Sequence, residues 1–225
     1  MNPKKYSFIL LAIIGILLAL NIISYLNAYY NDLATDTFFY RKFNFDKEKN
    51  FPSIFSSSLH FISSILLFII GYIHPKIRTK RYFWFSLSFL FLFLGLDELL
   101  RIHEAIGRSI DPFIERSGIF FYSWIIPYTI LLIILAFLFI KPVLQLPRKT
   151  LINFIIAGVI FVGGAVGFEV ITGLYVDYTN SENLVINFIP QVFVLYTIEE
   201  LLEMIGITFF IYELLRIINI YKISE

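Results

Sequence analysis

Residues 6–26 read YSFILLAIIGILLALNIISYL, an apolar run that contains no charged side chain. A helix needs about 20 mostly apolar residues to cross the hydrocarbon core of a bilayer, so this stretch is long enough to span it. No small-residue cleavage site follows, because residues 21–31 are polar and aromatic. We therefore expect a retained first membrane span and not a removable signal peptide.

The composition extends this expectation to the whole chain. The 225 residues are 58% hydrophobic and 16% charged, and the mean hydropathy is +0.79. A soluble domain is usually about half apolar or less, so lipid is the expected solvent for much of the surface. The net charge of +1 argues against nucleic acid as a partner, and the lack of cysteine excludes disulfides, Cys-ligated zinc and iron–sulfur clusters.

Five further stretches meet the same length requirement. The sequence therefore predicts an all-α fold, a polytopic transmembrane helical bundle of about six spans that forms one domain over residues 1–225. The predicted spans are residues 6–26, 54–73, 82–100, 120–140, 151–173 and 189–218. In the fifth span, Gly163 and Gly167 form a G-x-x-x-G pair, which we interpret as a site of close helix packing.

The loop charges predict the orientation, since lysine and arginine gather on the cytoplasmic side of membrane proteins. Basic residues lie before the first span, in the loop between the second and third spans, in the loop between the fourth and fifth spans, and in the C-terminal tail. They are Lys4, Lys5, Lys76, Arg78, Lys80, Arg81, Lys141, Lys149, Arg216 and Lys222. The other loops are mixed or acidic. We expect both termini in the cytoplasm and a multi-pass protein of the cytoplasmic (inner) membrane.

Ionisable side chains lie inside or beside these spans, where a carboxylate costs at least about 2.5–3.5 kcal/mol to insert. With the predicted orientation they fall in one layer, in the outer half of the bilayer. These candidate ligands are His60, Asp97, Glu98, His103, Glu104, Glu169, Glu199, Glu200 and Glu203. Arg101 and Arg108 offer the fixed positive charge nearby, and Arg101 is the expected ion-pair partner.

So many carboxylates cannot all stay ionised where the dielectric constant is low, so several are protonated or a cation lies among them. Carboxylate and imidazole ligands suit iron, manganese or zinc. The best candidate ligands are Glu199, Glu203, Glu169, Glu98 and His60. Three functions stay open: a metal-binding enzyme that acts on a lipid-like substrate, a cation- or proton-coupled transporter or channel subunit, and a scaffold held by salt bridges around Arg101.

Three segments carry a resemblance. They are Asp46-Lys-Glu-Lys-Asn-Phe-Pro52, Leu96-Asp-Glu-Leu-Leu-Arg-Ile-His-Glu104 and Thr197-Ile-Glu-Glu-Leu-Leu-Glu-Met-Ile-Gly206. Together they resemble an uncharacterised family of bacterial polytopic membrane proteins. The resemblance implies one recurring site, formed by Asp46, Glu48, Asn50, Pro52, Asp97, Glu98, His103, Glu104, Glu199, Glu200 and Glu203, and it implies no activity. Membrane lipids are the expected partners; a homo-oligomer and protein partners stay open.

Overall fold

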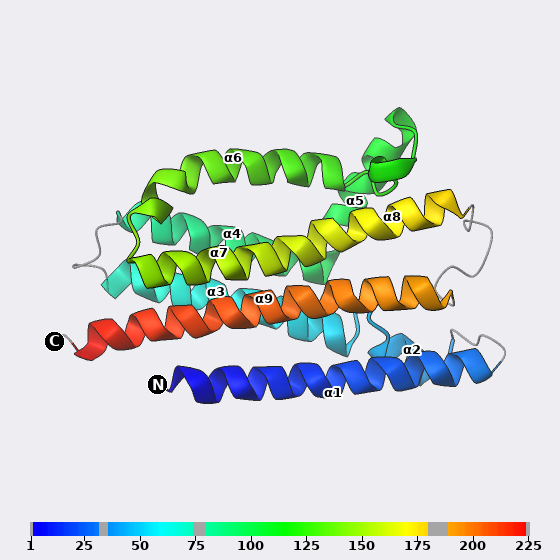
Figure 1. The fold of residues 1–225 in the computed structure, drawn as a ribbon, viewed down its shortest axis with the longest axis horizontal. Helices are drawn as coiled ribbons and strands as arrows, with labels where there is room; N and C mark the ends of the chain where they lie inside the picture. The colour runs from blue at the N-terminus through cyan, green and yellow to red at the C-terminus, as the bar shows by residue number, and fades with distance from the viewer. Residues whose placement is uncertain (1, 32–35, 74–79, 180–188, 224–225) are drawn as a thin grey trace.

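The fold is a bundle of helices that run side by side along one long axis (Figure 1). The computed structural model describes residues 2–31, 36–73, 80–179 and 189–223. Within these ranges the regular structure is helical, with no strand. The predicted all-α class is therefore confirmed for the described part of the chain.

Five helices are long and apolar enough to cross a membrane. They are α1 (Pro3–Tyr30), α3 (Phe51–Ile73), α4 (Arg81–Leu100), α6 (Ile125–Leu144) and the continuous helix Arg148–Tyr178, which comprises α7 (Arg148–Val162), the π-helical η3 (Gly163–Phe168) and α8 (Glu169–Tyr178). The predicted sixth span corresponds to α9 (Pro190–Ile223). This helix has the length, but it carries acidic residues in its middle and is not among the five.

Short helices gather at the end of the bundle that lies away from the two termini (Figure 1). They are α2 (Phe38–Phe43), α5 (Ile102–Ile110), η1 (Asp111–Phe113) and η2 (Gly118–Phe120). The side chain of Thr37 accepts a hydrogen bond from the backbone N–H of Tyr40 and caps α2. This end of the molecule is therefore built from short helices and loops, and it holds the site described below.

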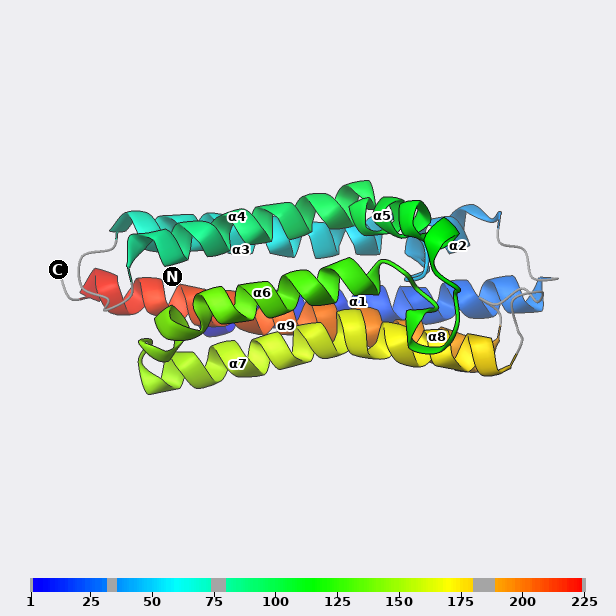
Figure 2. The same ribbon diagram turned by 90° about the horizontal axis from the view of Figure 1, so that it is seen from above.

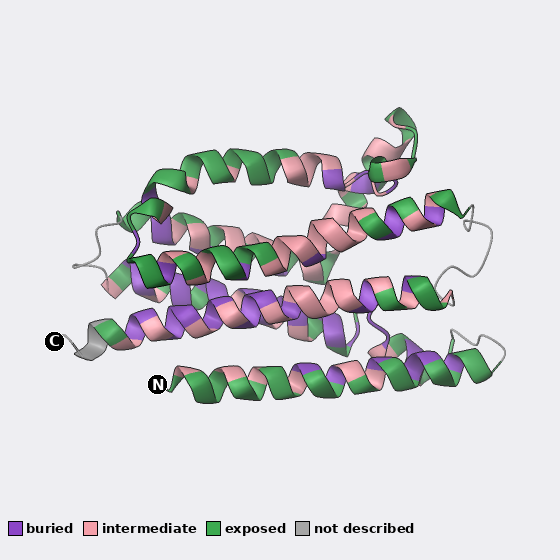
Figure 3. Cartoon of the chain, viewed as in Figure 1, coloured by how far each residue is buried: buried purple, intermediate pink, exposed green. Residues whose placement is uncertain are grey.

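Helix α9 lies at the centre of the bundle, in contact with α1, α3, α7, η3 and α8. Figure 2 shows α3 and α4 on one side of it and α7 on the other. Its side chains between Met204 and Ile218 are mostly buried. The acidic turn of α9, residues 199–203, precedes this buried stretch and is half-buried, whereas α6, whose residues from Ile130 to Leu144 are mostly exposed, covers the outside (Figure 3).

The glycine contact in the fifth predicted span differs from the expected one. A Cβ atom at Gly163 or Gly167 would meet nothing within 4 Å, so this pair makes no close helix contact. A Cβ atom at Gly164 would instead lie 2.8 Å from the carbonyl oxygen of Glu199 in α9. The prediction assumed an α-helical spacing, but the i→i+5 bonding of η3 changes which residue faces α9.

A buried ion pair lies near the end that holds the termini, and the sequence did not single it out. Glu213 is fully buried. Its carboxylate accepts hydrogen bonds from Nε of Arg216 at 2.7 Å and from Nδ2 of Asn153 at 2.7 Å, and Arg216 also donates to Oγ1 of Thr150 at 3.1 Å. These bonds join α7 to α9, so Arg216 serves packing as well as the expected basic tail.

Both termini lie at the same end of the bundle (Figure 1). Lys4 and Lys5 begin α1 at this end, and the connection from α6 to α7, with Lys141 and Arg148, returns to it. Two further residues of the predicted basic loops, Lys76 and Arg78, lie outside the described residues. The fold thus separates a basic end from an opposite end that is rich in carboxylates.

Candidate functional site

The segment between α2 and α3 is tied to the bundle by buried asparagines. Asn21 in α1 accepts a hydrogen bond from the backbone N–H of Phe45 at 2.9 Å and donates to Oγ1 of Thr197 at 3.0 Å. Asn44 donates to the hydroxyl of Tyr196 at 2.8 Å. Because both bonds to α9 end on the residues just before its acidic turn, the segment is held directly beside that turn.

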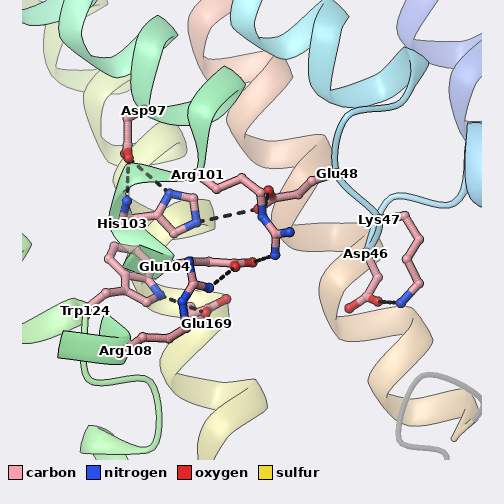
Figure 4. Close-up of polar contacts among 10 residues, drawn as sticks. All are labelled: Asp46, Lys47, Glu48, Asp97, Arg101, His103, Glu104, Arg108, Trp124 and Glu169. Atoms are coloured by element: carbon pink, nitrogen blue, oxygen red, sulfur yellow. Dashed lines mark hydrogen bonds and ion pairs between the residues drawn. The ribbon is translucent and has the colours of Figure 1, made fainter. Parts of the chain in front are cut away.

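The same segment presents Glu48 to the site. Asn50 donates to the carbonyl oxygen of Asn44 at 2.7 Å and closes the loop on itself. Lys49 has a φ of 57°, a left-handed conformation that is uncommon for a residue other than glycine. The resulting turn places the side chain of Glu48 against Arg101 (Figure 4).

A sharp corner between α4 and α5 positions Asp97 and His103. Arg101 has a φ of 61°, and its backbone N–H donates to the carbonyl oxygen of Asp97 at 2.7 Å, which ends α4. The buried carboxylate of Asp97 then accepts a hydrogen bond from the backbone N–H of His103 at 2.6 Å and lies 3.3 Å from its Nδ1 (Figure 4). Asp97 therefore orients the imidazole ring and directs Nε2 toward Glu48, 3.8 Å away.

Arginines neutralise the outermost carboxylates. The Arg101 guanidinium contacts both Glu48 and Glu104, and Arg108 binds Glu104 with an Nη1–Oε2 distance of 2.8 Å. Burial opposes ionisation of Glu104, but the hydrogen bonds from Arg101 and Arg108 lower its pKa overall. Burial and the charge of Glu104 raise the pKa of Glu48 to about 7, in spite of Arg101. The outer part of the predicted site is thus an ion-pair network.

His103 belongs to the same network. Its burial favours the neutral ring, but the hydrogen bond and charge of Asp97, together with the charges of Glu48 and Glu98, raise its pKa overall. In the part of the chain that the structure describes, Glu48, His103 and Glu104 form the one set of three ligand residues whose atoms lie within 4.8 Å of one another. Arg101 already occupies the space between the two carboxylates, so it would compete with a metal ion there.

The inner carboxylates lack such partners. Glu98 comes from α4, Glu169 from the start of α8, and a third group from one turn of α9: Glu199, Glu200 and Glu203. Among the described residues, no lysine, arginine or histidine nitrogen lies within 4.0 Å of a carboxylate oxygen of Glu98, Glu199, Glu200 or Glu203. Their negative charge is therefore uncompensated by side-chain ion pairs within the described structure.

Glu169 connects the inner carboxylates to the aromatic wall of the site. It accepts a hydrogen bond from Nε1 of Trp124 at 3.2 Å (Figure 4). Glu169 and Glu199 line both cavities, so their carboxyl groups share one site. Two carboxyl groups can hydrogen-bond each other only through a shared proton, and a bound cation is the other way to hold them together.

His60 lies deepest among the predicted ligands. It is 2% exposed, and its Nδ1 lies 3.0 Å from the carbonyl oxygen of Ser56. A carbonyl oxygen can only accept, so Nδ1 carries the proton in the neutral ring and Nε2 carries the lone pair. Nε2 is buried and has no hydrogen-bond partner in the structure, which leaves a metal-ligating atom unused.

Two adjoining cavities hold these groups. The outer cavity has a volume of about 360 Å³ and is lined by the acidic residues Glu48, Glu104, Asp111, Glu169, Glu199 and Glu200, among others. The inner cavity has a volume of about 290 Å³ and is lined by His60, Glu98 and Glu203 on its polar side. Glu48, His103, Trp124, Glu169, Glu199 and Glu200 line both, so the two cavities meet at the acidic turn of α9.

The structure thus divides the predicted residues into two groups. Asp97, Arg101, His103 and Glu104 form the outer ion-pair network. His60, Glu98, Glu169, Glu199, Glu200 and Glu203 line the cavities and lie outside this network, whereas Asp97, His103 and Glu104 belong to the network and line the cavities as well. Reasoning from the spans alone missed Glu48, which lies in a loop, but the resemblance carried by the Asp46–Pro52 segment implied it. The sequence does not single out Trp124, and nothing in its local pattern indicates the bond to Glu169.

These features define a class of protein: an all-α chain with membrane-length helices and, near one end, a chamber formed by the two adjoining cavities and lined by carboxylates and histidines. The chain belongs to a family described as a domain of unknown function (DUF8692), whose match covers residues 8–217. No curated protein and no solved structure matches the chain. The family match assigns no activity, so the function has to be inferred from the chemistry of the two cavities.

Proposed function

We propose that the chain is a six-span protein of a bacterial cytoplasmic membrane, with α9 as the sixth span and both termini in the cytoplasm. The five membrane-length helices support a multi-pass protein. The basic residues at the end that holds the termini support the orientation, since such residues gather on the cytoplasmic side. The chamber then lies in the outer half of the bilayer.

We further propose that the inner cavity binds a divalent metal ion and that the protein is a metal-dependent enzyme for a lipid-like substrate. One observation carries this proposal: the buried Nε2 of His60 has a lone pair, no partner, and a place in a cavity beside Glu98 and Glu203. A hydrogen bond from Nδ1 to a backbone carbonyl is the usual way in which a metal-binding histidine is oriented.

His60, Glu98 and Glu203 are the proposed ligands, and Glu169 and Glu199 lie toward the mouth of the inner cavity. Carboxylate and imidazole ligands suit iron, manganese or zinc. The inner ligand atoms are not yet within one coordination sphere, so binding requires rotation of the glutamate side chains. A metal ion bound here would polarise an oxygen of the substrate or activate water, and the surrounding helices would exclude bulk solvent.

The test is metal analysis of the purified protein after chelation and reloading with iron, manganese or zinc. We expect about one ion per chain, lost in both His60→Gln and Glu203→Gln, and retained in Glu115→Gln, which removes an exposed carboxylate at the same end of the molecule. Circular dichroism and thermal melting establish that each variant is folded. Metal loss in folded Glu48→Gln alone, or no metal in the wild-type protein, would overturn the proposal.

The transporter alternative rests on the carboxylates that line both cavities from the outer end inward. Between His60 and the end that holds the termini, buried apolar side chains pack α3 against α9: Leu67, Ile70, Ile211 and Leu214. A cation path would require these two helices to separate. Cation- or pH-dependent flux in liposomes, without stoichiometric metal, would support this alternative. The scaffold alternative explains the Arg101 network, but it leaves the inner carboxylates and His60 unexplained.

A further inference from the structure

The inner cavity has an apolar wall that reaches the lateral surface of the bundle, where α6 is exposed. Leu131 and Leu132 of α6 line this cavity, yet they are 38% and 39% exposed. Phe91 and Leu94 of α4 and Val162 at the end of α7 continue the apolar wall. For a protein in a bilayer, residues that are both cavity lining and lipid-facing mark a place where a hydrocarbon chain can pass between the two environments.

The outer cavity combines carboxylates with aromatic rings. Tyr122, Trp124 and Tyr196 line it together with Glu169 and Glu199. Aromatic faces attract organic cations, and rings arranged around a cavity are the usual means of recognising a quaternary ammonium group. The basic side chains at this end do not offset the acids. Arg101 and Arg108 are engaged by Glu48 and Glu104, and Arg108, Arg116 and His103 line the outer cavity against seven aspartates and glutamates.

We propose that the two cavities together bind a single-chain amphiphile with an ammonium head group, the head in the outer cavity and the hydrocarbon chain along the apolar wall of the inner one. The combined volume is within the range of small-molecule sites, about 300–1,000 Å³. This inference rests on the lipid-like substrate of the proposed function and names its class, but it does not depend on the metal ion.

The charge of the head group follows from the charged side chains that line the outer cavity. An anionic head would meet Glu169, Glu199 and Glu200 across the same cavity, and like charges in a partly desolvated site repel strongly. With a neutral head, only protons would neutralise those carboxylates. An ammonium group supplies the counter-charge and contacts the rings of Trp124 and Tyr122 at the same time.

The binding experiment uses Trp124 as the reporter. The chain has two tryptophans, so Trp84→Phe leaves Trp124, which lines both cavities, as the single fluorophore. The protein is placed in nanodiscs of a neutral glycolipid. Three chain-brominated probes with the same 12-carbon tail are titrated: an alkyltrimethylammonium, an alkyl phosphate and an alkyl maltoside. Quenching of Trp124 reports occupancy, and the metal content of each sample is measured separately.

We expect the ammonium probe to quench at a concentration at least about tenfold lower than the other two probes. Glu199→Gln should remove this preference, and Glu115→Gln should keep it. Ala165→Phe, which fills the inner cavity, should abolish quenching by all three probes, whereas Val159→Phe on the exposed face of α7 should not. Equal affinities, or a preference for the phosphate, would overturn the inference.

The two proposals fail separately. Stoichiometric metal with no ammonium preference would support the metal site and refute the proposal that an ammonium amphiphile binds. A preference for ammonium in metal-free protein supports the amphiphile even if metal analysis finds no ion in the wild-type protein.

Discussion

His60 and Ser56 lie one turn apart in α3, and Nδ1 of His60 lies 3.0 Å from the carbonyl oxygen of Ser56. Since the carbonyl can only accept, the bond fixes the proton on Nδ1 and leaves the lone pair on Nε2, which is buried without a hydrogen-bond partner in a residue that lines the inner cavity. The local helix geometry thus prepares the ring as a ligand before any ion binds.

Nitrogen-15 spectra of histidine-labelled protein test this tautomer. In metal-free protein at neutral pH we expect a protonated Nδ1 and an unprotonated Nε2 for His60, with the resonances assigned by their absence in His60→Gln. Zinc should shift the Nε2 resonance most. A protonated Nε2 in the metal-free protein would contradict the assignment, because that nitrogen could not then bind a metal ion.

The contact of Gly164 with α9 predicts a strong difference between neighbouring glycines. Gly164→Ala would place a methyl group 2.8 Å from the carbonyl oxygen of Glu199, and such overpacking typically costs about 1–3 kcal/mol. Gly163→Ala meets open space and should leave the free energy of unfolding unchanged or slightly raised. Unfolding in mixed micelles measures both, and equal effects would show that η3 does not pack as described.

The buried Glu213–Arg216 pair predicts a large stability loss on single substitution. Glu213→Gln leaves the Arg216 guanidinium without its counter-charge, which typically costs about 3–5 kcal/mol. Replacing both, as Glu213→Leu with Arg216→Met, should recover most of this loss because the buried charge is removed as well. A double-mutant cycle on the free energy of unfolding checks this, and additive losses would show that the two side chains do not interact.

Arg101 predicts a pH-dependent stability change. Arg101→Gln leaves Glu48 and Glu104 facing each other and should destabilise the protein by about 1 kcal/mol above pH 7, a modest value because the pair is partly exposed. The pKa of Glu104 is lowered in the folded protein, so its contribution is present at neutral pH and is lost as the pH falls. The difference from wild type should therefore shrink toward pH 4, and a constant difference would contradict the network.

Apolar runs in the sequence indicated the approximate positions of the long helices, but not their ends: the predicted span 120–140 begins in η2, and α6 covers Ile125–Leu144. The 28-residue α1 contains the predicted residues 6–26, and α9 contains residues 190–218 of the last predicted span. Carboxylates within these spans also identified most of the acidic residues that line the inner cavity, since the cost of burying charge makes such residues rare. Proximity of His60 to the carboxylates followed only from the assumed depth of each span.

The remaining features depend on tertiary structure. The π-helical η3 changes the face presented by Gly163, Gly164 and Gly167, and no spacing rule for an α-helix could indicate this. Glu48 reaches the site because Asn21 and Asn44 hold its loop against α9. The bonds from Asn21 to Thr197 and from Asn44 to Tyr196 span 176 and 152 residues of sequence, and local patterns do not record them.

The most direct test of the metal proposal is anomalous X-ray scattering at the zinc absorption edge from crystals of zinc-loaded protein. We expect an anomalous peak in the inner cavity, about 2.0–2.2 Å from Nε2 of His60 and from a carboxylate oxygen of Glu203. A peak found only between Glu48, His103 and Glu104, or no peak in zinc-loaded crystals, would contradict the assignment of the inner cavity as a metal site.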